Sequence, residues 1–208
     1  MPESSSWNFF PEFYTKLLDI DHGAQVRNER GCRPRGTYTT GAPGQLDLMI
    51  VFQNPGNPVS EVEWNLERDQ PDIRQLSKIL WDFSGSVWSG AHYSRTYVVA
   101  RKEMAYLLDC KEADVIERVI FTNLVRSTPA QNLNFSKDTL RIGSDLLAEE
   151  IKLWKPKRVV AYGNVAARAM NRHNVNFDAE IPHPAALGKW LNSQVRRDYI
   201  DTIRHSLA

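Results

Sequence analysis

The most informative segment of this 208-residue chain reads Leu48-Met49-Ile50-Val51-Phe52-Gln53-Asn54-Pro55-Gly56. Five apolar residues in a row give way abruptly to polar and turn-forming ones, which predicts a buried strand over residues 46–52. Pro55 lacks an amide proton and Gly56 tolerates unusual backbone angles, so the strand must run into a turn.

Buried strands and helices alternate on both sides of this segment. Apolar runs at residues 119–125 and 158–162 predict two further strands. Helical spacing of apolar residues predicts helices over 10–20, 71–81, 139–153, 165–170 and 190–207. Asn164 is a natural N-cap for the fourth of these helices. Strands that alternate with helices form parallel sheets covered on both faces. We therefore expect an α/β fold, a three-layer α/β/α sandwich with a mainly parallel four-stranded sheet.

The length and composition fit one globular domain, with 42% hydrophobic and 25% charged residues. We expect a single domain over residues 1–208, in which residues 1–44 form an N-terminal helix and an Arg- and Gly-rich loop. The longest apolar run, 48–52, is far shorter than the roughly 20 residues of a membrane span. Residues 1–7 lack the pattern of a signal peptide. These features predict a cytoplasmic location, nucleoid-associated if the organism is bacterial, and no membrane contact.

Cysteine and histidine patterns argue against a metal or cofactor. Cys32 and Cys110 are too few for a disulfide framework or a four-thiolate iron–sulfur cluster. No Cys-x-x-Cys or His-x-x-x-His pair indicates structural zinc. We predict no metal site and no organic cofactor.

Charge is distributed unevenly along the chain, although the net charge is only +1. Residues 151–208 contain ten Lys or Arg and four Asp or Glu, so this part carries +6 and the rest −5. A basic segment of this kind suits contact with phosphates. Solvated helix faces explain it equally well, and the sequence leaves both interpretations open.

Polar residues follow the predicted strands where a parallel sheet binds its ligands, beyond the carboxyl ends of the strands. Residues 53–56 follow the first strand, and Asn123 stands near the end of the second. His183 begins a further loop after the third strand and its helix. We expect these three places to border one crevice.

At these three places the chain resembles the uracil-DNA glycosylase superfamily. Residues 52–56 resemble the Gly-x-Asn-Pro-Gly motif that positions water in the mismatch-specific and single-strand-selective branches. Residues 121–125 are similar to the strand whose Asn reads the uracil edge, and residues 183–188 to the His-Pro-Ser-x-Leu loop. Residues 159–167 resemble the strand, glycine and helix that precede this loop. The resemblance spans about residues 46–190 and rests on the order of the motifs together, while the cysteine count excludes the iron–sulfur branches.

The resemblance implies catalytic roles for Asn54 and His183. Breaking the glycosidic bond builds positive charge on the sugar and negative charge on the leaving base, so a donor and a placed water are needed. A neutral His183 would donate to the base oxygen that becomes anionic, and Asn54 would hold the water. Because an amide has no basic lone pair, Asn54 would not deprotonate that water, which predicts a comparatively slow enzyme.

The resemblance also implies a set of substrate-binding residues. Asn123 carries both a donor and an acceptor and would pair with N3–H and O4 of uracil. Gln53, Pro55 and Gly56 would lie beside the base. Trp64 is the nearest candidate for the aromatic residue that stacks on it, although packing in the core is an equally good role for this side chain.

Two residues of the last loop would contact DNA. Leu187 would fill the space left by the flipped base, and Lys189 would meet a phosphate. Ala185 stands where the family has a phosphate-contacting Ser, which predicts a weaker grip on DNA. Ordinary structural roles, as turn formers, strand ends or core side chains, are the alternative for each residue of the predicted site.

We therefore expect a monomeric hydrolase that excises uracil or a related damaged base from single- or double-stranded DNA, in base excision repair. One alternative is a nucleobase- or nucleic-acid-binding protein of the same fold with weak or no catalysis, which Ala185 and the uncertain stacking aromatic favour. Another is an N-glycosidase that acts on free nucleosides. Leu187 and the basic C-terminal segment argue against this last alternative.

Overall fold

The computed structural model describes residues 39, 41–53, 95–125, 135–183 and 193–207. The predicted helices at residues 10–20 and 71–81 and most of the loop before residue 44 lie outside this part of the chain. So do six residues of the predicted site, which are Asn54, Pro55, Gly56, Trp64, Leu187 and Lys189.

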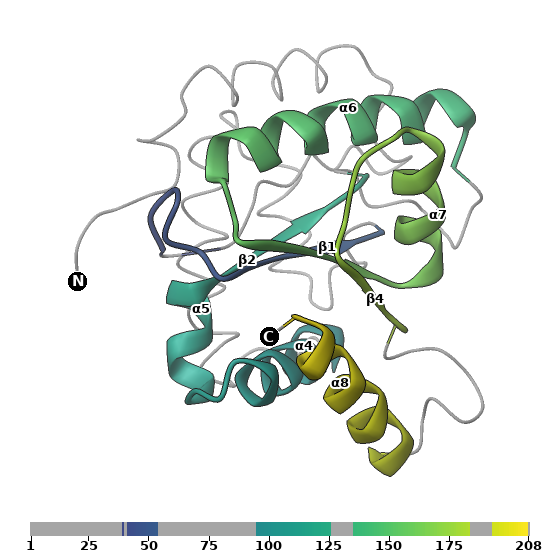
Figure 1. Cartoon of the computed structure of the whole chain (residues 1–208). Coiled ribbons are helices and arrows are strands. Elements are labelled where there is room, and N and C mark those ends of the chain that lie inside the picture. The colour runs from purple at the N-terminus through teal and green to yellow at the C-terminus, as the bar shows by residue number, and fades with distance from the viewer. Residues whose placement is uncertain (1–38, 40, 54–94, 126–134, 184–192, 208) are drawn as a thin grey trace, which may run out of the picture.

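Four parallel strands form the sheet at the centre of the molecule (Figure 1). They are β1 (Leu48–Phe52), β2 (Val119–Asn123), β3 (Arg158–Tyr162) and β4 (Ala179–Ile181). Their order across the sheet is β2-β1-β3-β4, and all three neighbouring pairs are parallel. The strand with the strongest apolar run, β1, therefore lies inside the sheet, where both of its faces are covered.

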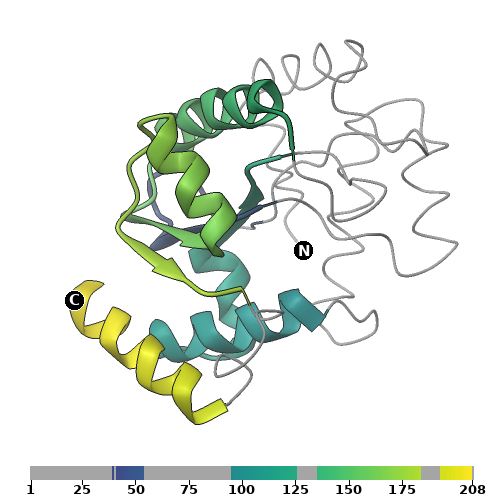
Figure 2. The same ribbon diagram turned by 90° about the vertical axis from the view of Figure 1, so that its right-hand side faces the viewer.

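Helices cover both faces of this sheet, so the predicted three-layer α/β/α fold is confirmed (Figure 2). On one side lie α4 (Arg95–Leu107) and α8 (Ser193–Leu207), and on the other α6 (Lys137–Trp154) and α7 (Asn164–Arg172). The short helices η2 (Glu112–Asp114) and α5 (Val115–Arg118) lead into β2. In the described part of the chain, no helix has the length and apolar character needed to cross a membrane.

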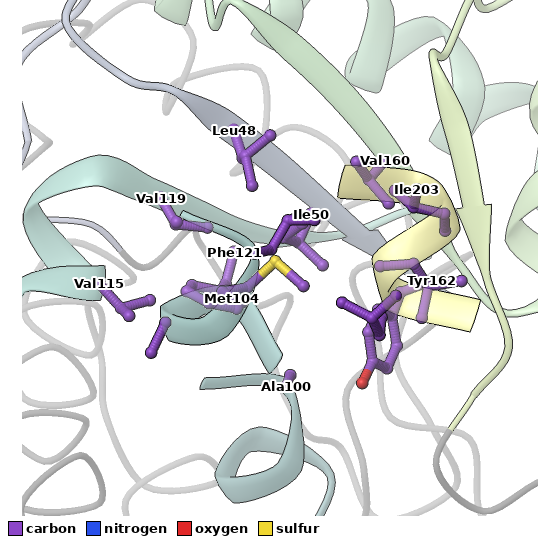
Figure 3. Packing of buried hydrophobic residues seen from close by; sticks show 14 of the residues in the cluster. Leu48, Ile50, Ala100, Met104, Val115, Val119, Phe121, Val160, Tyr162 and Ile203 are labelled. Carbon is purple, nitrogen blue, oxygen red and sulfur yellow. The ribbon is translucent and has the colours of Figure 1, made fainter. Parts of the chain in front are cut away.

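Alternation along the strands divides the core into two layers. Leu48 and Ile50 point toward α4 and α8, where Met104 and Ile203 pack in the same cluster (Figure 3). Phe52 also belongs to this cluster. Met49 and Val51 point toward α6 and α7. All five β1 residues are buried, which explains why this segment reads as an unbroken apolar run.

Several predicted boundaries differ from the structure. The strands predicted at 46–52 and 119–125 are shorter, while α6 begins two residues earlier than predicted, where the Ser136 hydroxyl accepts from the Thr139 amide. The prediction of Asn164 as an N-cap was wrong. Gly163 occupies that position with a φ of 110°, and exposed Asn164 is the first residue of α7. The strand turns sharply into the helix here, and glycine adopts that backbone angle without the usual steric cost.

Candidate active site

The four strands end level with one another, which brings distant segments to one edge of the sheet. Phe52 is in register with Asn123 on one side and with Tyr162 on the other, and Tyr162 with Ile181. The residues that follow these ends, Gln53, Leu124, Gly163 and Pro182, therefore line the same edge. This is the edge where parallel sheets bind ligands.

Asn123 has a fully buried side chain at the end of β2. Strand alternation puts it on the face that also carries Phe52 and Tyr162, the face toward α4 and α8. Neither Nδ2 nor Oδ1 has a hydrogen-bond partner among the described residues. Leaving a buried polar group unpaired costs about 1–3 kcal/mol. An incoming group with one acceptor and one donor would remove that cost.

The backbone holds this end of β2 firmly beside Gln53. The Leu124 amide donates to the Phe52 carbonyl at 2.8 Å and the Val125 amide to the Gln53 carbonyl at 2.9 Å. On the other face, Gly143 of α6 approaches so closely that an added Cβ would lie 2.2 Å from the Leu124 carbonyl oxygen. The Asn123 amide is thus presented from a rigid part of the molecule.

A buried hydrogen bond fastens the neighbouring residue of β2 to α6. The Thr122 hydroxyl donates to Oε2 of Glu150 at 2.8 Å, and both side chains are fully buried. This contact lies on the face opposite to Asn123, because consecutive strand residues point to opposite sides. It anchors the strand end without occupying the Asn123 side.

His183 follows β4 and lies against the end of β3. The Gly163 amide donates to the Ile181 carbonyl at 2.7 Å, so the two strand ends continue in parallel. A Cβ added to Gly163 would lie 3.3 Å from Cβ of His183. The rings of Tyr162 and His183 meet edge to face with centroids 6.2 Å apart. A residue without a side chain at position 163 is therefore what allows His183 to come this close.

The imidazole of His183 is in an environment that favours its neutral form. Burial lowers its pKa from the ordinary value of 6.5, and the positive charge of Arg196 lowers it further. A neutral imidazole carries one N–H donor and one acceptor. At neutral pH, His183 can thus donate a hydrogen bond to a developing anion without bringing a full positive charge.

Three predicted site residues, Gln53, Asn123 and His183, lie at this single edge of the sheet. Sequence reasoning missed Tyr162 and Gly163, which shape the place of His183, although both stand directly at the end of a predicted strand. Within the described ranges, no group of three His, Cys, Asp or Glu side chains is arranged to hold a metal ion. Among the described residues, an amide and a neutral imidazole offer hydrogen bonds at this edge.

Comparison with protein families shows the family of the chain. The model of the uracil DNA glycosylase superfamily matches residues 38–205, which include all four strands and the edge just described. The chain belongs to the uracil DNA glycosylase superfamily. Membership in this superfamily implies DNA glycosylase activity in general, with hydrolysis of an N-glycosidic bond and DNA as the partner. A comparison with curated proteins found no match.

Proposed function

We propose that this protein excises uracil or a closely related damaged base from DNA and leaves an abasic site. The observation that carries the proposal is the buried amide of Asn123, whose two polar atoms have no partner among the described residues. It lies at the same strand-end edge as His183, in a chain of the uracil DNA glycosylase superfamily. Base excision repair is the process in which such an activity is used.

Uracil matches the Asn123 amide in its hydrogen-bonding groups. Its N3–H would donate to Oδ1, and its O4 would accept from Nδ2. An extruded base must compensate for the few kcal/mol of stacking and pairing that it loses. Pairing with a buried amide that has no partner among the described residues supplies part of this compensation, because it also relieves the cost of the unpaired groups. Asn123 would therefore select as well as hold the base.

His183 would stabilise the leaving base. Cleavage leaves negative charge on the pyrimidine and positive charge on the sugar, and a fixed donor at the anionic oxygen lowers the barrier most directly. The depressed pKa of His183 supports this role because the neutral ring keeps an N–H to donate. No proton has to leave the protein in this step.

The remaining assignments rest on the sequence resemblance. Asn54 would position the attacking water, which groups the protein with the mismatch-specific or single-strand-selective branches. Gln53, Pro55, Gly56 and Trp64 would border the base. Leu187 would occupy the space left in the duplex, and Lys189 would contact a phosphate. We further propose that the protein acts as a monomer and without metal or cofactor.

An excision assay on defined oligonucleotides tests the proposal. End-labelled single and double strands carrying uracil, hypoxanthine, mismatched thymine or cytosine are incubated with the protein, and abasic sites are then cleaved with alkali. We expect cleavage at uracil with and without EDTA, and none at cytosine. Binding of uracil-containing DNA without cleavage would instead show the catalytically inactive alternative. Release of uracil from deoxyuridine but not from DNA would show a nucleoside hydrolase.

A further inference from the structure

A buried polar network joins three elements next to His183. The Arg196 guanidinium on α8 donates through Nε to Oε1 of Glu103 on α4, at 2.6 Å. The Tyr162 hydroxyl at the end of β3 donates to Oε2 of the same carboxylate. Arg196 Nη2 lies 3.3 Å from the Tyr162 oxygen. The side chains of Arg196 and Glu103 are each only 12% exposed, so this ion pair is largely shielded from solvent.

This network reaches the predicted catalytic loop directly. Arg196 Nη1 donates to the carbonyl oxygen of Pro182 at 3.0 Å, and Pro182 is the residue before His183. The Tyr162 ring in turn contacts the His183 ring edge to face. His183 is therefore bordered on one side by the aromatic ring of the network and tied on the other through its own backbone.

We propose that Arg196 is a positioning residue, which holds the Pro182–His183 segment against the end of the sheet and so fixes where the imidazole meets the base. The inference rests on the proposed role of His183 in excision. Arg196 itself acts through His183 and does not touch the substrate.

Arginine suits this task better than lysine for a geometric reason. Its three nitrogens point to three fixed acceptors, the Glu103 carboxylate, the Pro182 carbonyl and the Tyr162 oxygen. A planar guanidinium makes such contacts simultaneously, whereas an ammonium on a flexible stem cannot keep all three directions. The largely shielded carboxylate of Glu103 keeps the guanidinium in place, and removing one member alone would leave a shielded charge without its partner.

The same network affects the charge of His183. The Tyr162 ring from β3 contacts the imidazole, and the Arg196 guanidinium from α8 acts on it through its charge. The Glu103 carboxylate from α4 is hydrogen-bonded to both Tyr162 and Arg196. Burial lowers the pKa of His183, and the Arg196 charge lowers it further. Removing that charge should therefore raise the pKa toward the ordinary value of about 6.5.

Two variants distinguish the effect of Arg196 on the position of His183 from the effect of its charge on the His183 pKa. Arg196→Lys keeps the positive charge but loses the three simultaneous contacts of the guanidinium. We therefore expect the His183 pKa to stay low and single-turnover excision to fall about 10²-fold, the loss that a misplacement of about 1 Å produces. The double variant Arg196→Met with Glu103→Gln removes both charges. Here we expect the excision rate to fall, the His183 pKa to rise and the acid limb of the pH–rate profile to move to higher pH.

The measurements are NMR titration of the His183 imidazole in the free protein and single-turnover excision between about pH 4 and pH 8. Arg197→Met is the matched control, because it removes a positive charge from an exposed neighbouring position on α8. We expect that control to leave the His183 resonances and pKa unchanged. Thermal unfolding identifies any variant that does not fold.

An Arg196→Lys protein that folds and keeps the parent's excision rate overturns the proposal. If the Arg196 variants do not fold, Glu103→Gln decides, because it weakens the contact that keeps the Arg196 guanidinium on the Pro182 carbonyl. A shifted His183 resonance with slower excision then supports the proposal, and an unchanged resonance and rate overturn it. Failure of the parent protein to excise any base would reject the proposed function, while the titration would still measure how Arg196 acts on His183.

Discussion

His183 is useful to the proposed reaction only while its imidazole is neutral. Its pKa is lowered by burial first and by the Arg196 charge second, so the neutral form persists below pH 6.5. Protonation, and with it the loss of the neutral donor, occurs as the pH falls through the lowered value. Excision that depends on His183 should therefore decline only on the acid side of 6.5.

We expect His183→Ala to lower single-turnover excision of uracil by about 10²–10³-fold, the loss that follows removal of one oxyanion donor. The measurement is the rate of alkali-labile product formation at saturating protein. Circular dichroism and the unfolding midpoint provide the control for folding. A folded variant with the parent's rate would exclude His183 from the reaction.

Asn123 should set the choice of base. Replacing Asn123 by Asp exchanges a donor for an acceptor, so we expect the preference to shift from uracil toward cytosine, whose exocyclic amine can donate to a carboxylate. In a site that excludes water, replacing a donor by an acceptor should change the relative binding of the two bases by a few kcal/mol. The overall activity should fall because a buried charge is costly.

The quantity to compare is the ratio of excision rates on uracil and cytosine in otherwise identical single strands. Asn123→Leu, which removes both polar atoms, should reduce excision of uracil without improving that of cytosine. An identical ratio in Asn123→Asp and the parent would show that Asn123 does not read the base.

At the scale of elements, the position of His183 depends on how closely the backbone that links β3 to α7 approaches it. Gly163 links β3 to α7 with a φ of 110° and leaves 3.3 Å between its absent Cβ and Cβ of His183. Gly44, before β1, also has a positive φ of 78°, but an added Cβ there would meet nothing within 4 Å. The two glycines share a need for backbone freedom and differ in what surrounds them.

This difference gives a matched pair of variants. Both Gly163→Ala and Gly44→Ala should destabilise the fold by about 1–2 kcal/mol, because alanine is strained at positive φ. Only Gly163→Ala should also slow excision, since the new methyl group presses on His183. Urea unfolding measures the first effect and single-turnover excision the second. Equal excision rates in the two variants would mean that the position of His183 is insensitive to this contact.

At the scale of the whole molecule, the two ends of the sheet have different tasks. The carboxyl ends carry Asn123 and His183, and the opposite ends are tied together by Asp47. Its carboxylate accepts from Lys157 at 2.8 Å and from Arg118 at 2.5 Å. The Asp47 amide also donates to the Arg118 carbonyl, and the Arg158 amide to the Asp47 carbonyl. One residue thus connects the starts of β1, β2 and β3.

The Asp47 connection predicts a dependence of stability on pH. Burial by itself would raise the pKa of Asp47, but the hydrogen bonds from Lys157 and Arg118 outweigh it and lower the pKa. A carboxyl group with a lowered pKa in the folded state stabilises the protein above its unfolded value of about 3.9, and this contribution disappears as the pH falls through the folded value.

We expect Asp47→Asn to reduce the free energy of unfolding by about 1–3 kcal/mol at pH 7, as for loss of hydrogen bonds to charged groups. The difference from the parent should shrink as the pH is lowered below 4. Asp145→Asn is the control, because the Arg141–Asp145 pair is exposed and worth little. Urea unfolding across this pH range gives both values, and a difference that does not change with pH would contradict the argument.

The sequence predicted a helix or strand correctly where packing against neighbouring elements produces a regular pattern of apolar residues. The bounds of β3 were predicted correctly, and β1 and α6 to within two residues, because burial on both faces gives a continuous apolar run and burial of one helix face gives a stripe. The same reasoning predicted the α/β class and that Gln53, Asn123 and His183 lie at the ends of strands or just beyond them. The superfamily was predicted from the resemblance of the motifs at these places to a known family.

The sequences of two other elements, α4 and β4, show no such regular pattern. No element was predicted over α4, in which Arg95, Arg101, Lys102 and Glu103 interrupt the apolar residues, and β4 is only three residues long. The fourth strand is recognisable only by its pairing with β3. Its place at the edge of the sheet is nevertheless what brings His183 beside Tyr162.

The sequence by itself determined the class of fold and which residue types end the strands, because these depend on short-range patterns of burial and turn formation. It also indicated the family, through the resemblance of its strand-end motifs. Only the tertiary structure decided how His183 is held. Arg196 and Glu103 are 93 positions apart, and Tyr162 lies between them on a third element. Their contact depends on how α4 and α8 pack over one face of the sheet. No local pattern encodes that packing, because the ion pair is stable inside the protein only when all of its hydrogen-bonding partners are brought together.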